Sequence, residues 1–308
     1  MGRVDSFTFE GDRLEYEDYG SGARTFVLLP GLLLSRQMHA PLAESLAARG
    51  NRVVCLDLLG HGNSDRPEGL SRYSMPIFGT QVVGLLDHLG LDEAVVGGTS
   101  LGANVTLDVA VRAPDRLRGM VLEMPVLDNA LVACAVAFTP LMVGLTLGAP
   151  AARLVARATR LVPRGASHLS DVMLDWVSQD PGPSACVLEG LFFDRIAPTH
   201  AERRTIETPA LVLGHDRDPI HPFSDADELV GELRNARIVR ARSLLELRLR
   251  PERLTGEIGG FLDECWRPAA AGRRSGSRQR SRKDASGARN GRSSARPARA
   301  RRASAQQR

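Results

Sequence analysis

Residues 94–104 read A-V-V-G-G-T-S-L-G-A-N, and this stretch decides the fold that the sequence predicts. Its short apolar, β-branched start is typical of a buried strand, and residues 103–113 have the pattern of a helix. Gly98 and Gly102 flank Ser100 in a G-x-S-x-G pattern, whose small residues permit a sharp turn that lifts the serine hydroxyl clear of the sheet. We therefore expect Ser100 to be an exposed nucleophile in a strained strand-to-helix turn.

Strand patterns and helix patterns alternate on both sides of this turn. A hairpin is predicted at residues 8–10 and 14–19, further strands at 24–29, 52–56, 117–123, 209–214 and 237–241, and helices at 38–49, 73–89, 225–233 and 251–266. Such alternation favours a mostly parallel sheet with helices on both faces. The predicted fold class is therefore α/β.

Residues 125–205 interrupt this alternation with irregular helical segments and no convincing strand. Within them, residues 129–152 carry no formal charge and are long enough to raise the question of a membrane span. Pro140, Gly144 and Gly148 weaken that interpretation, and the segment lies between two strands of one sheet. We expect an inserted helical cap over a lipophilic pocket, and no membrane span.

The net charge of +4 hides an uneven distribution along the 308 residues. Residues 267–308 hold 14 Lys and Arg and one acid, which leaves 26 basic against 35 acidic residues before them. We predict four parts: a core at 1–124, a cap at 125–205, a second part of the core at 206–266, and a disordered arginine-rich tail at 267–308. The tail could attract nucleic acid or an anionic surface. No aromatic residue follows Trp266 to stack on bases, so we favour a solvated extension without a partner.

The four cysteines lie far apart in apolar contexts and show no C-x-x-C spacing; they are Cys55, Cys134, Cys186 and Cys265. This pattern predicts buried free thiols in a reducing compartment and favours neither a metal site nor a disulfide framework. The first residues lack the apolar core of a signal peptide, so we expect a cytoplasmic protein.

Four motifs resemble the α/β-hydrolase superfamily, in the right order, over residues of about 5–266. They are L-L-P-G-L at 28–32, D-L-L-G-H-G-N-S at 57–64, the G-x-S-x-G turn, and G-H-D-R-D-P-I-H-P at 214–222. The resemblance implies acyl transfer to water, with Ser100 as nucleophile and the backbone N–H groups of Leu32 and Leu101 as oxyanion donors. It also places the catalytic acid at Asp218, with Asp216 as a close competitor.

The sequence departs from the family at the catalytic histidine. In the family this base commonly follows the last strand as Gly-His, some seven residues before Pro-Glu. Here Pro251-Glu252 is present, but Ser243-Leu244 stands in place of Gly-His, and no histidine follows His221. The standard triad is therefore incomplete at its usual positions.

Three solutions to the missing base stay open. His221, three residues after Asp218, could turn toward Ser100 and take Glu123 as its acid partner. A histidine of the cap, His168 or His200, could reach the serine instead. In the third case there is no base, and the pocket binds a ligand or performs weak chemistry.

These observations favour a cofactor-independent hydrolase that acts on a carboxylic ester, lactone or thioester with an apolar part. The alternative is a ligand-binding protein that keeps the fold but lacks the standard base. In the region of the lost histidine motif, Glu246 and Arg248 are expected to form an ion pair that holds the loop.

Overall fold

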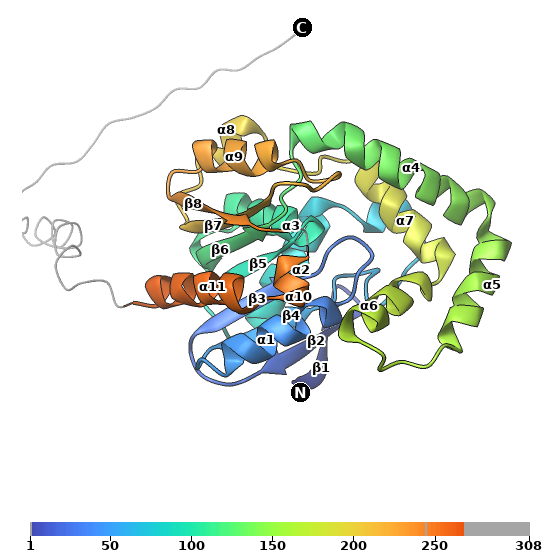
Figure 1. The fold of residues 1–308 in the computed structure, drawn as a ribbon, viewed down its shortest axis with the longest axis horizontal. Coiled ribbons are helices and arrows are strands. Elements are labelled where there is room, and N and C mark those ends of the chain that lie inside the picture. Colours follow the sequence, from blue (N-terminus) through green and yellow to red (C-terminus); the bar gives the residue numbers. More distant parts are fainter. Residues whose placement is uncertain (1, 244, 268–308) are drawn as a thin grey trace, which may run out of the picture. The chain divides into compact units, whose positions relative to one another are not determined.

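A computed structural model describes residues 2–243 and 245–267, and these form one compact unit (Figure 1). The tail predicted from residue 268 onward lies outside the described residues. Within the described part, eight strands form one sheet in the order β1-β2-β4-β3-β5-β6-β7-β8. The strands are β1 (Arg3–Phe9), β2 (Asp12–Tyr19), β3 (Thr25–Leu29), β4 (Arg52–Leu56), β5 (Ala94–Thr99), β6 (Leu117–Glu123), β7 (Ala210–His215) and β8 (Ala236–Ala241).

The sheet is antiparallel only at one edge. Strand β2 pairs antiparallel with both β1 and β4, whereas every pairing from β4 to β8 is parallel. Parallel strands all end at the same edge of a sheet, so the loops after β3, β5, β6 and β7 meet there. The predicted hairpin and mostly parallel sheet are confirmed, although β1 begins earlier than the sequence pattern suggested.

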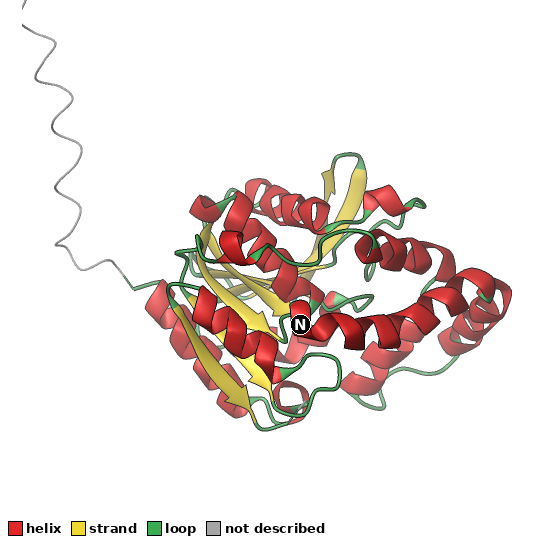
Figure 2. Cartoon of the chain, turned by 90° about the horizontal axis from the view of Figure 1, so that it is seen from above, coloured by secondary structure: helices red, strands yellow, loops and turns green. Residues whose placement is uncertain are grey.

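Helices cover both faces of the sheet (Figure 2). One face packs against α2 (Met75–His88), α3 (Leu101–Arg112) and α9 (Phe223–Glu232), and the other against α1 (Ala40–Ala47) and α11 (Glu252–Cys265). Two separate apolar clusters result, because alternate residues of each strand point to opposite faces. In β5, for example, Val96 belongs to the first cluster and Val95 to the second.

Five helices lie between β6 and β7 and form the inserted cap that the sequence predicted. They are α4 (Leu131–Leu147), α5 (Ala149–Arg160), α6 (His168–Val177), α7 (Pro181–Phe192) and α8 (His200–Arg203). Among the described residues, Asp128–Leu147 is the one helical segment long and apolar enough to cross a membrane by length and composition, with a mean hydropathy of 2.2. In this structure the segment packs along α7 as a wall of the cap.

The cysteines are free, as expected, but they are less buried than the sequence suggested. Only Cys55 is fully buried, while Cys134, Cys186 and Cys265 are partly accessible. Cys134 lies on α4 and Cys186 on α7, so two of the partly accessible thiols belong to the cap rather than to the core.

Candidate active site

Ser100 occupies a strained turn between β5 and α3. Its backbone angles are φ 54° and ψ −109°, a region that residues with a Cβ rarely adopt. A Cβ on Gly98 would lie 2.5 Å from the carbonyl oxygen of Leu29, and one on Gly102 would meet the same oxygen. The two glycines are therefore required by the close approach of β3, and the turn lifts the Ser100 side chain above the sheet.

The loop between β7 and α9 brings a histidine to this serine. The Nε2 atom of His221 lies 2.9 Å from Oγ of Ser100, and its Nδ1 atom lies 2.8 Å from Oδ2 of Asp218. An Nδ1–H that donates to the carboxylate leaves Nε2 free to accept the serine proton. Ser100, His221 and Asp218, all named from the sequence, are thus joined by hydrogen bonds.

The carboxylate of Asp218 is held in its charged form. Its Oδ1 atom accepts the backbone N–H groups of Ile220 at 2.8 Å and of His221 at 3.0 Å. Burial raises the pKa of Asp218, but the hydrogen bonds and the charge of His221 outweigh burial and leave the pKa below its ordinary value. The competitor Asp216 is exposed and pairs with Arg240 at 3.2 Å.

Glu123, which the sequence left open as an alternative acid, is not the partner of His221 in this structure. Its carboxylate is buried beneath the elbow, where it accepts hydrogen bonds from Arg248 at 2.8 Å and from the hydroxyl of Thr99. Burial raises the pKa of Glu123, but the Arg248 guanidinium, His215 and the Thr99 hydroxyl together outweigh burial and hold the pKa far below its usual range. The backbone carbonyl of Glu123 also accepts the N–H of Ser100 at 2.8 Å, so this residue supports the elbow.

The expected ion pair between Glu246 and Arg248 does not form. Glu246 binds Arg253 at 2.8 Å and accepts the backbone N–H of Arg242, while Arg248 reaches across the fold to Glu123. The short helix α10 (Glu246–Leu249) sends the two side chains to different partners. As a result, a partly buried arginine from the segment that replaces the usual histidine motif binds Thr99 and Glu123, next to the nucleophile's turn.

The cap histidines do not reach Ser100. His200 is held by Glu232, with 2.6 Å between Nδ1 and Oε1, and by Asp128 at 3.1 Å. His168 begins helix α6 at an exposed position. Among the described residues, one group has the donor atoms of a metal site, namely Asp128, His200 and Glu228. Its side chains already take part in an ion-pair network, in which Arg203 binds Glu228 at 3.1 Å.

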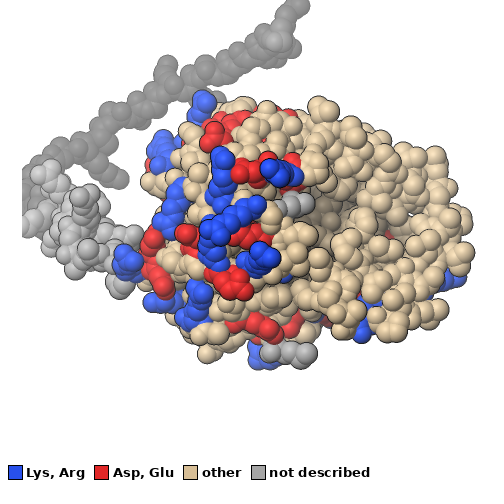
Figure 3. Space-filling view, viewed as in Figure 1, with Lys and Arg blue, Asp and Glu red and all other residues tan. Residues whose placement is uncertain are grey.

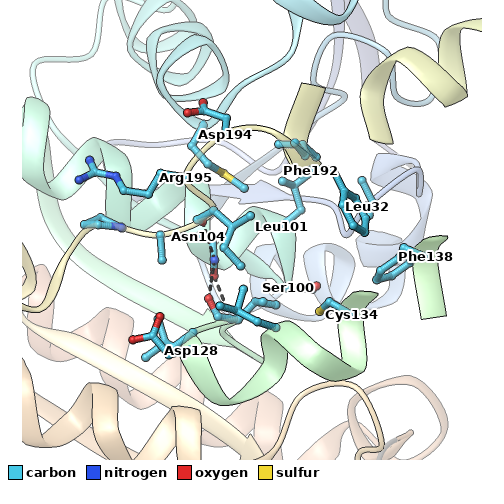
Figure 4. Close-up of a pocket in the computed structure, with 18 of the residues that line it drawn as sticks. Leu32, Ser100, Leu101, Asn104, Asp128, Cys134, Phe138, Phe192, Asp194 and Arg195 are labelled. Carbon is cyan, nitrogen blue, oxygen red and sulfur yellow. Dashed lines mark hydrogen bonds between the residues drawn. The ribbon is translucent and has the colours of Figure 1, made fainter. Parts of the chain in front are cut away.

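The residues that carry the two predicted oxyanion donors line the same cavity as the nucleophile. Leu32, Ser100 and Leu101 all line one cavity (Figure 4). Within the described part of the chain, the N–H groups of Leu32 and Leu101 have no protein acceptor. The N–H of Leu101 lies in the first turn of α3, where the helix leaves its donors unpaired and the helix dipole favours negative charge.

The cavity has a volume of about 480 Å³, which suits a small organic ligand. Helix α4 lines it with Leu131, Cys134, Ala135 and Phe138, and α7 with Leu188, Leu191 and Phe192. Its wall also carries ionisable side chains; they are Asp128, Asp194, Arg195, His200 and Arg203. The cavity is therefore mainly apolar, as predicted for the space under the cap.

Asn104 is a site residue that the sequence did not reveal. It lies one turn after Ser100 on α3, and its buried side chain donates to the carbonyl oxygens of Val126 and Ile196 at 2.7 Å each. It also accepts the N–H of Val126 at 3.0 Å (Figure 4). The segments that enter and leave the cap are thus both attached to the helix of the nucleophile. The one sequence signal is an amide in a helix whose buried face is otherwise mostly apolar.

Comparisons with known proteins agree with this fold. The family described as alpha/beta hydrolase fold matches residues 24–237. A 2-hydroxymuconate semialdehyde hydrolase of Pseudomonas sp. is 37% identical over 115 residues, which are 36% of this chain and 40% of that protein. Haloalkane dehalogenase 2 of Mycobacterium tuberculosis is 30% identical over 175 residues, or 56% of this chain and 60% of that protein. The chain thus matches less than two thirds of the length of either relative.

A solved structure resembles the chain over a greater length. The enol-lactonase of Burkholderia xenovorans LB400 has a TM-score of 0.68 and 25% sequence identity. The match covers 84% of this chain and 99% of the lactonase.

Proposed function

Because the chain belongs to the alpha/beta hydrolase fold family, we propose that it is a serine hydrolase. Its substrate in this proposal is a carboxylic ester, lactone or thioester with an apolar part, and it requires no cofactor. The observation that carries the proposal is the pair of hydrogen bonds that link Ser100 to His221 and His221 to Asp218. The enol-lactonase among the similar structures makes a lactone a natural member of this substrate class.

In the proposed reaction, Oγ of Ser100 attacks the carbonyl carbon while Nε2 of His221 takes the hydroxyl proton. Asp218 accepts the Nδ1–H of His221 and stabilises the imidazolium that forms. The negative oxygen of the tetrahedral intermediate faces the N–H groups of Leu32 and Leu101, and each such donor typically contributes about 10²–10³ in rate.

Collapse of the intermediate breaks the bond between the carbonyl carbon and the leaving group, which takes the proton from His221. The product of this step is an acyl ester on Ser100. A water molecule then attacks the acyl carbon and gives a proton to His221, and the carboxylic acid leaves as Ser100 recovers its proton. Both halves of the reaction use the same base, so one imidazole is sufficient.

The cavity supports an apolar substrate. Side chains from α4 and α7 line it, and burial of apolar atoms contributes about 25 cal/mol per Å² of surface removed from water. The alternative of a ligand-binding protein without a base has less support, because an imidazole lies within hydrogen-bond distance of Ser100.

Turnover of short p-nitrophenyl esters tests the proposal. We expect Ser100→Ala to abolish turnover, while a chelator has no effect on the unchanged protein. The matched control is Ser6→Ala, which removes a partly exposed serine hydroxyl on β1 and should leave turnover unchanged. Equal turnover by Ser100→Ala and the unchanged protein would exclude this serine as the nucleophile.

A further inference from the structure

Helix α4 is apolar on both its inner and its outer face. Its inner side chains, among them Phe138, Leu141 and Leu145, pack against the core cluster of the fold. The outer face carries Val132, Val136, Pro140, Val143 and Leu147, whose spacing of three and four residues places them in one row. Val132, Val136 and Leu147 are 75%, 72% and 81% exposed. A helix of this kind ordinarily has a second apolar partner.

Helix α5 extends the same exposed apolar surface. Leu154 and Val155 are 68% and 53% exposed, and Leu161 just beyond the helix is 85% exposed. Figure 3 shows the consequence: charged side chains gather over the core of the fold, and the surface over α4 and α5 is nearly free of them. A contiguous apolar surface that extends over two helices is unusual on a globular domain and is typical of an interaction site.

The formal charges that the α4–α5 segment itself carries have one sign, although Asp175 of α6 pairs with Arg164 at 3.1 Å. Residues 129–170 contain four arginines and no acid. Arg153, Arg157 and Arg160 share one side of α5, next to its exposed apolar row. Within the described residues, Arg153 and Arg157 have no ion-pair partner, and Arg160 binds only the carbonyl oxygen of Ser178, at 3.0 Å.

We propose that the outer surface of α4 and α5 docks on an anionic lipid bilayer, lying in its interface without crossing it. Exposed apolar side chains beside a row of arginines are the composition of interfacial helices, which bury their apolar face at the boundary of head groups and acyl chains. The free arginines then reach the anionic head groups, each contributing about 1 kcal/mol near such a surface.

A transmembrane arrangement does not fit, because the inner face of α4 is occupied by α7 and by the cavity. A contact between two copies of the chain fits less well than a bilayer. A two-fold contact uses the same patch on both copies, and residues 129–170 offer no acid to the arginines of the second copy.

Docking would place the outer face of α4 against the lipid phase. The inner face of α4 forms a wall of the cavity beside Ser100. Apolar substrates concentrate in that phase, so this consequence rests on the proposed hydrolase function, whereas the docking itself does not.

Flotation of the full-length protein with lipid vesicles tests the proposal without measuring hydrolysis. The vesicles contain phosphatidylcholine with about 30% phosphatidylglycerol, because anionic lipid supplies the charge that the arginines require. We expect Val136→Glu/Val143→Glu to lower the partition coefficient about tenfold or more, since two exposed apolar side chains become charged. Val4→Glu, at a 51% exposed position on β1, is the matched control and should bind as the unchanged protein does.

The arginine-rich segment after residue 267 is present in every variant, so its attraction to the vesicles is common to all. At about 0.5 M salt this purely electrostatic attraction is screened, because the Debye length falls to about 4 Å, while the apolar contribution of α4 remains. At low salt, Arg153→Gln/Arg157→Gln should weaken binding to anionic vesicles and leave binding to pure phosphatidylcholine unchanged. Circular dichroism spectra and melting curves verify that each variant folds.

Three results would overturn the proposal. The first is equal flotation of the glutamate variant and the unchanged protein at high salt. The second is an unchanged protein that does not float at all. The third is a dimer in sedimentation experiments that the glutamate variant makes monomeric without any vesicle binding, which would assign this surface to a second copy of the chain.

Discussion

The ion pair between Arg248 and Glu123 should be the most sensitive point of the elbow outside the catalytic side chains. Arg248→Met removes the guanidinium and leaves the carboxylate of Glu123 without its arginine partner. The side chain of Glu123 is only 4% exposed, so water cannot readily replace that partner. Removing one partner of a buried pair typically costs about 3–5 kcal/mol. Because the side chain of Arg248 is itself 15% exposed, we expect a value near the lower limit, about 3 kcal/mol in the free energy of unfolding at pH 7.

Urea denaturation of four proteins measures this effect. The double variant Glu123→Gln/Arg248→Met removes the buried charge and should recover a large part of the lost stability. Arg24→Met breaks an exposed pair with Asp263 and should cost less than about 1 kcal/mol. The pKa of Glu123 is lowered in the folded protein, so the pair stabilises the fold above the unfolded pKa and its contribution disappears as the pH falls. A single variant as stable as the unchanged protein, or a double variant as unstable as the single one, would refute this reasoning.

Three further predictions follow from the geometry of the site and of the core. Asp218→Asn should lower kcat by about 10²–10⁴ in ester hydrolysis, because an amide does not hold the Nδ1–H tautomer of His221; an unchanged kcat would contradict the role of Asp218. Gly102→Ala should lower the free energy of unfolding by about 2 kcal/mol in denaturation, since the added Cβ would meet the carbonyl oxygen of Leu29. In the control Gly256→Ala, on α11, the added Cβ meets open space, and we expect a gain in stability of about 0.5–1 kcal/mol. Burial lowers the pKa of His39 and of His61 to about 4, so each neutral imidazole supports the fold above pH 6.5 and this support is lost as the pH falls. At pH 5 we expect each histidine to lower the free energy of unfolding by about 2 kcal/mol. A free energy of unfolding that does not change between pH 7 and pH 5 in denaturation would contradict this prediction.

The fold could be predicted because its signals are local. The elbow depends on two glycines that lie within two residues of Ser100, and the sheet depends on short apolar runs that end in polar turns. His221 could also be predicted as a site residue, because it lies three residues from Asp218 in the loop that supplies the acid. The helical, apolar cap could be predicted for a similar reason, because its apolar residues follow one another in a single continuous stretch of the chain.

The partners of buried charges could not be predicted in this way. Glu123 ends β6, and its partner Arg248 lies 125 residues later in a segment that matches no family motif. Nearness in sequence favoured a pair between Glu246 and Arg248, but the short helix α10 directs one toward Arg253 and the other toward the elbow. The choice between Asp218 and Glu123 as the partner of His221 needed the structure, in which Asp218 binds His221 while Arg248 and Thr99 bind Glu123.

The rate at which a fluorophosphonate labels Ser100 tests the central claim most directly, because only an activated serine reacts with this probe. If His221 is the base, His221→Gln should lower the labelling rate by about 10² or more, while His200→Gln in the cap should label as fast as the unchanged protein. If His221→Gln instead labels at the rate of the unchanged protein, His221 is not the base that activates Ser100.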